Sequence, residues 1–225
     1  MSNGNNKKTF SHLVMRKSFR FFSWGIRVPF AISLFFLYSK MKKGRAMDKK
    51  TYRQSVRRRM KELSRDYQEK CRREEQVTDR LFLAEEWQKA DVVAVTLSMD
   101  TEFNTERIIR QALQDGKTVG VPRTFPAGQM DFYAYDSQTK LTRTSFGVLE
   151  PETDRLIRPE QIDLLIVPGV VFRDDGYRIG FGGGFYDRYL DRYQGRTISL
   201  IFTEQLNNDW QPEEYDRPVQ KLLIG

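Results

Sequence analysis

Histidine and cysteine are almost absent from this chain. The only histidine is His12, so residues 47–225 contain none. This absence excludes Ser-His-Asp and Cys-His catalysis, and it excludes every metal site that needs an imidazole ligand. Cys71 is the single cysteine, which rules out an intrachain disulfide and fits a reducing compartment, so we expect a cytoplasmic location. The chemistry must therefore depend on carboxylates, Lys, Arg, Tyr, backbone amides and a hard cation such as Mg²⁺.

The common phosphate-binding fingerprints are missing as well. A complete Walker A pattern, Gly-x-x-x-x-Gly-Lys-Ser/Thr, does not occur. A dinucleotide fingerprint read from Gly180 requires a glycine where the chain has Phe185. What the chain does contain is the run Arg178-Ile-Gly-Phe-Gly-Gly-Gly-Phe-Tyr-Asp187, with glycine at positions 180, 182, 183 and 184. This glycine loop therefore follows neither of the two phosphate-binding patterns.

A helical pattern follows these glycines directly. Tyr186, Tyr189, Leu190 and Tyr193 recur at i, i+3, i+4 and i+7, which predicts an amphipathic helix. A glycine loop that opens a helix presents backbone N–H groups to an anion, and the helix dipole adds positive potential. The alternative is a tight loop that needs positive φ and binds nothing. We favour phosphate binding, because the arginine before the loop supplies an anion partner and Asp187 a possible metal ligand.

The net charge of +8 belongs to one end of the chain. Residues 1–46 hold ten basic residues and no acidic residue, whereas the rest of the chain holds 28 basic and 30 acidic residues. The body is therefore close to neutral. A nucleic-acid partner for the body loses its main support, and we expect none.

The basic segment, residues 1–46, also carries an apolar run. Val28–Ser39 is 12 residues long, which as a helix spans about 18 Å against a hydrocarbon core of about 30 Å. The segment is either a membrane-surface anchor or an extension upstream of a start at Met47. We favour a start at Met47, where the composition changes abruptly. Membrane contact is then expected only if residues 1–46 belong to the protein.

Strand-like and helix-like segments alternate along the body. Helices are predicted at Asp48–Leu63 and Asp66–Ala90, and a third begins at Asn104 or Thr105 and ends at Gly116. Continuous apolar runs of strand length are typical of buried parallel strands. The predicted strands are Asp91–Leu97, Lys117–Pro122, Met130–Tyr135, Ile162–Val167, Thr197–Phe202 and Gln220–Ile224. This alternation predicts a single three-layer α/β/α domain with a largely parallel sheet, formed by residues 47–225.

Further motifs accompany the glycine run, in a fixed order along the chain. They are Lys49-x-x-x-Arg53, Leu97–Glu102, Val121-Pro-Arg123, Phe146–Pro151, Asp163…Phe172 and Glu214-Tyr-Asp216. Together with Arg178–Leu190, they resemble the 5-formyltetrahydrofolate cyclo-ligase family, whose members are also called methenyltetrahydrofolate synthetases. The resemblance covers about residues 48–224. It implies an architecture related to that of sugar-phosphate isomerases and CoA-transferases.

The resemblance implies closure of 5-formyltetrahydrofolate to 5,10-methenyltetrahydrofolate, with release of ADP and phosphate. ATP and a reduced folate are the implied partners, and Mg²⁺ is the implied cofactor. The γ-phosphoryl group activates the formyl oxygen, N10 attacks the resulting carbon, and phosphate leaves. Phosphoryl transfer depends on positioning and charge neutralisation rather than on a protein nucleophile, so the lack of histidine is no obstacle.

The resemblance also implies roles for particular residues. Lys49 and Arg53 lie one helical turn apart and match ATP contacts, although a solvated basic face, as expected for Arg57–Arg59, is the alternative. The other implied ATP contacts are Arg178, Gly180, Phe181, Gly182, Gly183, Gly184, Phe185 and Tyr186, and of these Arg178 and Tyr186 are the implied catalytic residues. The implied folate contacts are Leu97, Met99, Glu102, Phe146, Gly182, Gly183, Gly184 and Phe185. Asp187 and Asp216 match Mg²⁺ ligands, and carboxylate oxygens are donors that this cation prefers.

Two loop positions depart from the family pattern. Some members carry Arg where this chain has Phe181, or Lys where it has Gly183. Those cations are missing here, so phosphate neutralisation falls on Arg178 and on the two cations of the first predicted helix. Because a side chain is accepted at Gly183, we expect its neighbours Gly182 and Gly184 to be the glycines that adopt positive φ or approach phosphate closely.

Simpler interpretations stay open for several of these residues. Asp187 alone is typical of the first turn of a helix, where it complements the dipole. For Phe146 and Tyr186, as flat walls for the folate ring, the alternative is ordinary core packing.

Two other functions stay open too. A sugar-phosphate isomerase or CoA-transferase on the same fold would not need the two helix-borne cations together with the two aspartates, and it would ignore MgATP. A membrane-associated binding module built on residues 1–46 would bind lipid. The oligomeric state is left undetermined by the sequence.

Overall fold

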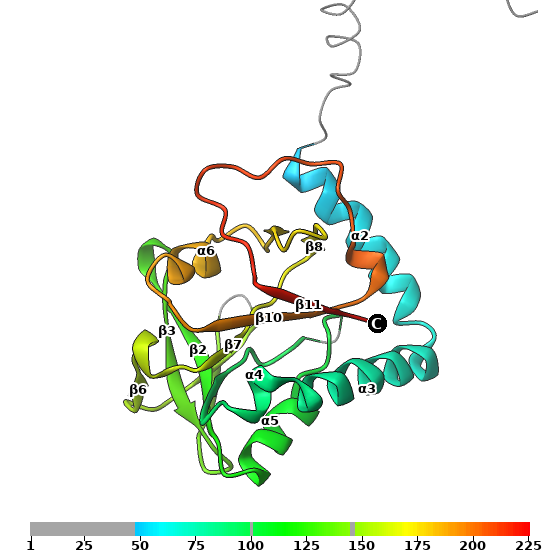
Figure 1. Cartoon of the computed structure of the whole chain (residues 1–225). Helices are drawn as coiled ribbons and strands as arrows, with labels where there is room; N and C mark the ends of the chain where they lie inside the picture. The colour runs from blue at the N-terminus through cyan, green and yellow to red at the C-terminus, as the bar shows by residue number, and fades with distance from the viewer. Residues whose placement is uncertain (1–47, 100, 145–146) are drawn as a thin grey trace, which may run out of the picture. The chain divides into compact units, whose positions relative to one another are not determined.

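The computed structural model describes residues 48–99, 101–144 and 147–225 (Figure 1). The predicted N-terminal extension and Phe146 lie outside the described residues. Within the three described ranges, no helix is both long enough and apolar enough to span a bilayer.

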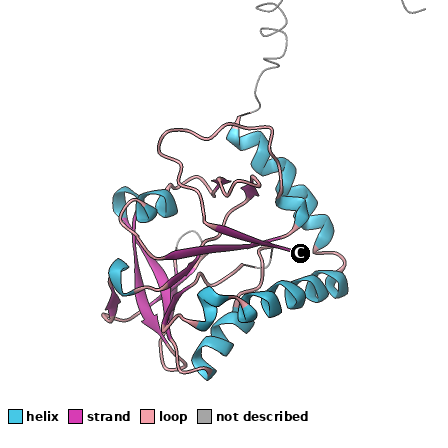
Figure 2. Cartoon of the chain, in the orientation of Figure 1, coloured by secondary structure: helices cyan, strands magenta, loops and turns pink. Residues whose placement is uncertain are grey.

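A seven-stranded sheet forms the centre of the described domain (Figure 2). Its strands lie in the order β11-β10-β7-β1-β2-β3-β6. Their bounds are β1 Val92–Ala94, β2 Thr118–Phe125, β3 Gln129–Tyr135, β6 Leu156–Ile157, β7 Leu164–Ile166, β10 Arg196–Ile201 and β11 Lys221–Ile224. All pairs from β11 to β2 are parallel, whereas β3 pairs antiparallel with both β2 and β6. The prediction of a largely parallel sheet is confirmed.

The central strands bury side chains on both faces of the sheet. Successive residues of a strand point to opposite faces. In β1, Val93 belongs to the larger core and Ala94 to the smaller one, and in β7 Leu164 and Leu165 divide in the same way. Because both faces are covered, these strands have continuous apolar sequences rather than alternating ones.

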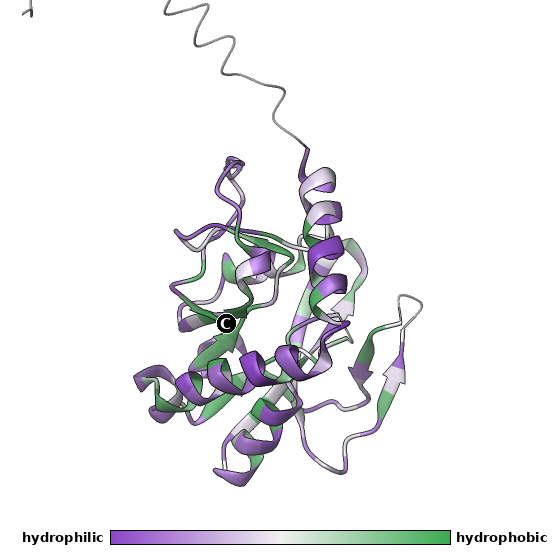
Figure 3. Cartoon of the chain, turned by 90° about the vertical axis from the view of Figure 1, so that its right-hand side faces the viewer, coloured by the Kyte–Doolittle hydropathy of each residue, from purple (hydrophilic) through white to green (hydrophobic). Residues whose placement is uncertain are grey.

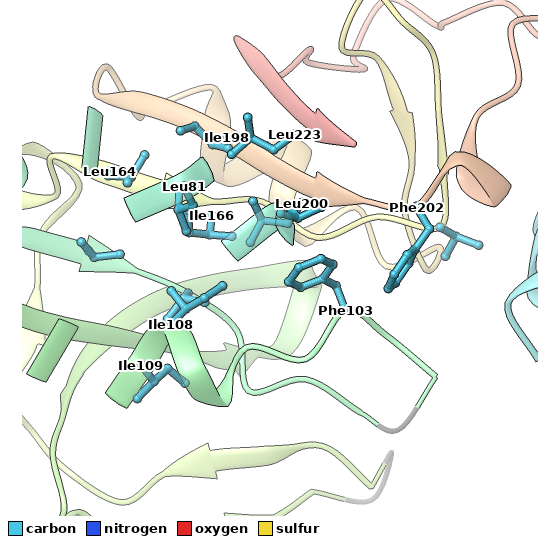
Figure 4. Close-up of a cluster of buried hydrophobic side chains, with 14 of the residues drawn as sticks. Leu81, Phe103, Ile108, Ile109, Leu164, Ile166, Ile198, Leu200, Phe202 and Leu223 are labelled. Atoms are coloured by element: carbon cyan, nitrogen blue, oxygen red, sulfur yellow. The ribbon is translucent and has the colours of Figure 1, made fainter. Parts of the chain in front are cut away.

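Helices cover the two faces and complete the three layers. Their bounds are α2 Lys49–Leu63, α3 Tyr67–Leu83, α4 Glu85–Gln88, α5 Glu106–Gln114 and α6 Phe185–Leu190. Helices α2 to α5 contribute to the larger core, whereas α6 packs with β3 in the smaller one. In Figure 4, Leu81 of α3, Ile108 of α5 and Ile166 of β7 gather in the larger core. The predicted α/β/α layering is confirmed.

Helix α2 starts at Lys49, directly after its capping residue Asp48. The Asp48 carboxylate accepts the backbone N–H of Thr51 at 2.8 Å, which satisfies one of the free donors of the first turn. The buried side of α2 consists of Tyr52, Val56, Met60 and Leu63, at helical spacing. In the view of Figure 3, much of the surface of α2 and α3 is hydrophilic. The basic residues of α2 are therefore free to face ligands or solvent.

The prediction of one helix over Asp66–Ala90 is wrong in one respect. The chain leaves helical geometry at Ala84, where ψ is 140°, and α4 begins after this break. The break leaves Leu83 81% exposed, whereas Trp87 becomes 1% exposed in the larger core. Burial of the large indole offsets the helical hydrogen bonds that are lost.

The predicted helix after the glycines is shorter than its apolar pattern suggests. Helix α6 ends at Leu190, so Tyr193 lies beyond it. Tyr189 and Tyr193 are nevertheless both buried in the smaller core. The Tyr193 hydroxyl donates to the backbone oxygen of Arg196 at 2.9 Å, which ties the turn after α6 to the start of β10.

Candidate active site

The glycine run begins on a short hairpin and ends in a helix. Strand β8 (Val171–Phe172) pairs antiparallel with β9 (Arg178–Ile179), and α6 starts at Phe185. Gly182 has a φ of 114° and Gly184 a φ of 68°, whereas Gly183 has no positive φ. The prediction that the two flanking glycines carry the unusual backbone is confirmed. Only glycine adopts such angles without strain.

Arg178 forms the base of the glycine loop. Its side chain is 2% exposed, and Nη2 donates to Oδ1 of Asp187 at 3.1 Å. Its Nη1 donates to the backbone oxygen of Arg217, whose own N–H donates to the same Asp187 oxygen at 3.3 Å. Burial lowers the pKa of the Arg178 guanidinium, and the nearby Asp187 carboxylate opposes that shift. Since arginine stays protonated in proteins, the loop has a fixed positive charge at its base.

The first half of α2 lies against the same region. Arg53 Nε donates to the carbonyl oxygen of Gly180 at 2.6 Å. Lys49 Nζ donates to both carboxylate oxygens of Asp216, at 2.8 and 3.0 Å, and to Glu213 at 2.7 Å. Burial alone would lower the pKa of Lys49, but its hydrogen bonds to the two carboxylates raise it overall. Both predicted ATP cations thus have specific partners at the site and do not form a merely solvated face.

The two predicted Mg²⁺ ligands reach the site from different segments. Asp187 lies in the first turn of α6, and Asp216, which is 5% exposed, also accepts the backbone N–H of Glu213. Within the part of the chain that the structure describes, no group of three or more His, Cys, Asp or Glu side chains could hold a metal. Magnesium usually takes one or two carboxylates, with water and phosphate oxygens in its other positions. Asp187 and Asp216 are donors of that kind, and both accept hydrogen bonds from basic side chains, Arg178 and Lys49.

A cavity of about 240 Å³, here called the loop cavity, opens beside the glycine run. It is lined by the loop and the start of α6, and also by the predicted folate contacts Leu97, Met99 and Glu102. Glu102 Oε2 accepts the backbone N–H of Met99 at 2.8 Å, and burial raises the pKa of this carboxyl. Phe146, another predicted folate contact, lies outside the described residues. The structure therefore brings Arg178, most of the glycine loop and the predicted folate contacts Leu97, Met99, Glu102 and Phe185 to one cavity, whereas Lys49, Arg53, Gly182 and Asp216 do not line it.

Tyr186 lines this cavity from the first turn of α6. Its hydroxyl is buried and, although Thr96 lies near, has no hydrogen-bond partner among the described residues. Burial raises the pKa of Tyr186 well above its ordinary value of 10.0, so the phenol is neutral. A buried hydroxyl without a partner is destabilising, and a ligand that accepts from it recovers that cost.

One wall of the loop cavity had no role assigned from the sequence. Strand β4 (Leu141–Arg143) pairs with β5 (Leu149–Pro151), and β5 brings Glu150 against Thr124 of β2. Glu150 Oε1 accepts the Thr124 hydroxyl at 2.6 Å and its backbone N–H at 3.1 Å. Glu150 belongs to the Phe146–Pro151 motif of the resemblance, so the sequence could have indicated it as a site residue. Thr124 has no such signal, because its place depends on how β2 and β5 meet in space.

The fold and this cavity define the class: an α/β enzyme whose candidate site residues lie around a glycine loop. Comparison with known proteins then gives the family. Residues 45–225 match the sequence profile of the 5-formyltetrahydrofolate cyclo-ligase family, so the chain belongs to that family.

Relatives and solved structures agree with this assignment. The chain is 36% identical to 5-formyltetrahydrofolate cyclo-ligase of Escherichia coli (strain K12) over 141 residues, 60% of this chain and 78% of that protein. It is 30% identical to 5-formyltetrahydrofolate cyclo-ligase of Mus musculus over 191 residues, 78% of this chain and 92% of that protein. The NMR structure of Aquifex aeolicus 5,10-methenyltetrahydrofolate synthetase matches with a TM-score of 0.69 and 29% identity, over 79% of this chain and 90% of that one.

Proposed function

We propose that this chain converts 5-formyltetrahydrofolate to 5,10-methenyltetrahydrofolate in an ATP- and Mg²⁺-dependent reaction that releases ADP and phosphate. The observation that carries the proposal is the loop cavity, which the glycine run shares with Leu97, Met99 and Glu102. Transfer between a triphosphate and a folate requires both to be held in contact. Membership in the cyclo-ligase family supports the same activity. A cytoplasmic location is part of the proposal.

The proposed reaction has two chemical steps. The formyl oxygen of the folate attacks the γ-phosphorus, and ADP leaves. N10 then attacks the formyl carbon and gives up its proton, while the carbon–oxygen bond breaks and phosphate departs with the bonding electrons. Neither step needs a protein nucleophile, so positioning and charge neutralisation are the main tasks of the protein.

Fixed cations perform the charge neutralisation in this proposal. Arg178 is held at the base of the loop by Asp187, and Arg53 is held at Gly180. Because both guanidinium groups already have positions at the loop, they need little reorganisation when phosphate binds. Lys49 is expected to exchange Asp216 for a phosphate oxygen. Bound Mg²⁺, held by the two aspartates, would supply further neutralisation of the triphosphate.

Two polar side chains of the loop cavity, Glu102 and Tyr186, are suited to hold the folate. Glu102 is a half-buried carboxyl acceptor, which matches the N–H edge of a pterin ring. The Tyr186 hydroxyl is a buried donor without a partner in the described residues. We propose that it donates to the oxygen on which negative charge develops during transfer.

An absorbance assay tests the proposed reaction. Methenyltetrahydrofolate should form from 5-formyltetrahydrofolate only when MgATP is present, with one ADP for each product molecule. Thermal unfolding with and without MgATP separates this activity from a sugar-phosphate isomerase or CoA-transferase on the same fold, since such an enzyme should ignore the nucleotide. Product formation without ADP release would contradict the proposal.

Loss of either α2 cation should weaken ATP binding more than folate binding. We expect Lys49→Ala and Arg53→Ala to raise KM for ATP by about ten- to a hundredfold, because each removes a charge-assisted contact of about 1.5–3 kcal/mol. Initial rates at varied ATP and varied folate give the two KM values. Arg58→Ala is the matched control, since Arg58 is an exposed cation of the same helix and is not the donor to Gly180, Glu213 or Asp216. Equal rises in both KM values would indicate a structural role instead.

The region from Met47 onward should be sufficient for activity. We expect residues 47–225 alone to fold and to turn over at the rate of the full chain, because every candidate contact lies at or after Lys49. Circular dichroism and the absorbance assay on the truncated and full-length proteins check this. A truncated protein that is insoluble or inactive, beside an active full chain, would contradict it.

A further inference from the structure

Arg188 is an exposed arginine of α6 to which the proposed reaction gives no role. Its Nη1 donates to the backbone oxygen of Gly183 at 2.7 Å and, at 3.4 Å, to that of Gly128. Gly183 belongs to the glycine run, whereas Gly128 lies in the turn Pro126–Gly128 that joins β2 to β3. One guanidinium therefore links the glycine loop to a turn from a distant part of the chain.

Two glycines leave room for this guanidinium. A Cβ at Gly184 would lie 2.9 Å from Arg188 Nη1, a contact that a small shift of the flexible side chain relieves. A Cβ at Gly128 would lie 2.1 Å from the same atom, so the guanidinium would have to leave its place. Arg188 takes part in none of the ion pairs of the described residues. Its position therefore depends on backbone oxygens and not on a carboxylate.

The bond to Gly183 fixes the direction of the next amide. In a planar trans peptide, the C=O of one residue and the N–H of the following residue point in opposite directions. Since the Gly183 oxygen faces Arg188, the Gly184 N–H faces away from it. Gly183 and Gly184 line the loop cavity and Arg188 does not. No backbone acceptor in the described part of the chain takes the Gly184 N–H, which leaves this donor available to an anion.

Arg53 holds the other end of the loop in the same way. Its Nε donates to the backbone oxygen of Gly180 at 2.6 Å, which turns the N–H of Phe181 away from α2. Glycine has no side chain that could restrict its own backbone. The directions of the loop amides therefore depend on these two contacts from outside the run.

We infer that Arg188 is a positioning residue for ATP: by holding the Gly183 carbonyl, it directs the Gly184 N–H toward a phosphate oxygen. This inference rests on the proposed function, which places the phosphates at the glycine loop. Arg188 acts through a peptide group and not by contact with the nucleotide. Its loss should let the peptide turn while Arg178 stays in place, and a donor that must reorganise before it binds is worth less to the reaction than a fixed one.

Kinetics on the full-length chain test the inference. Arg188→Met should lower kcat/KM for ATP by about ten- to a hundredfold, the scale for a misplaced contact, and leave KM for folate unchanged. Arg188→Lys keeps one donor, which is enough for one carbonyl, and should recover most of the loss. Arg192→Met is the matched control, since Arg192 donates to the backbone oxygen of Met130 at 2.6 Å and pairs with Asp131 but contacts no loop carbonyl. It removes the same charge and should keep both kinetic values.

Gly128 offers a test from outside the loop. Gly128→Ala should displace the guanidinium and so lower kcat/KM for ATP, although Gly128 itself does not line the loop cavity. If both residues act through one contact, Gly128→Ala should cost less than about twofold in a chain that already carries Arg188→Met. Additive losses in this double-mutant cycle would contradict the inference.

Calorimetry with MgATP, in the absence of folate, separates this inference from the proposed function. The unaltered chain should bind MgATP, and Arg188→Met should bind it at least about tenfold more weakly. Equal binding by the two proteins would overturn the inference and leave the proposed function standing. Equal losses in Arg188→Met and Arg192→Met would also overturn it, because the charge of the helix and not the held carbonyl would then be responsible. No binding by the unaltered chain would overturn both.

Discussion

Replacement of Arg178 by methionine should lower kcat by about a hundred- to a thousandfold, which is the scale for removal of one donor that is preorganised for transition-state charge. The guanidinium is buried at the base of the glycine loop and is fixed by Asp187 and by the backbone oxygen of Arg217. Methionine keeps much of the apolar volume but cannot neutralise the transferred phosphoryl group. Arg178→Lys should recover little, because an ammonium cannot hold both partners in the geometry of a planar guanidinium. The absorbance assay at saturating substrates measures kcat directly.

Arg73→Met is the matched control for this variant. Arg73 is likewise largely buried, pairs with Glu204 at 2.7 Å, and donates to the backbone oxygen of Gly225 at 2.6 Å. It does not line the loop cavity. Both variants should lose a similar amount of stability, about 1–3 kcal/mol for the unpaired groups left behind, and both are measured by denaturant unfolding. Only Arg178→Met should lose turnover; a rate above a tenth of the unaltered one, at a temperature where the protein is folded, would remove Arg178 from the chemistry.

The sequence predicted those features of the site that depend on local rules. The i, i+4 spacing of Lys49 and Arg53 predicted that both lie on one side of α2, and there they contact Asp216 and Gly180. The positive φ of Gly182 and Gly184 followed from the residue types that are accepted at the loop. The helical spacing is visible in this chain alone, whereas the prediction for the glycines also needed the residue types that the family accepts at Gly183.

Features that depend on distant segments were not predictable in the same way. Lys49 and Asp216 are 167 positions apart, and nothing in either motif indicates that they form an ion pair. The basic run around Arg57 has the sequence of a solvated face, yet the structure places Arg57 and Lys61 on a cavity whose other walls come from distant segments, among them Ile166 and Leu200. The break at Ala84 has a similar cause, because the burial of Trp87 in the larger core outweighs a helical sequence. Tertiary packing decided all three.

Gly182→Ala should be the most damaging single change in the glycine loop. At a φ of 114° an alanine is strained by about 1–3 kcal/mol, although the added Cβ would have open space, with the nearest atom of Arg53 at 3.7 Å. The loop must relax to relieve the strain, which moves the N–H groups proposed to hold phosphate. Turnover should therefore fall by about tenfold or more. Gly184→Ala should be less harmful, because its φ of 68° lies in the left-handed region, where the cost is about 1–2 kcal/mol.

Gly183→Ala is expected to be the best tolerated of the three, because this glycine has no positive φ. Its added Cβ would lie 2.4 Å from a ring carbon of Phe185, so the ring must rotate, but the obstacle is a side chain and not the backbone. Turnover should stay within about threefold of the unaltered rate, a change of less than 1 kcal/mol in the barrier. Gly183→Lys should lower KM for ATP by supplying a cation to the phosphates. The three alanine variants would be compared by circular dichroism and by ATP-dependent turnover. If Gly183→Ala proves the most damaging, Phe185 rather than the glycine backbone sets the geometry of the loop, and the phosphate-binding assignment fails.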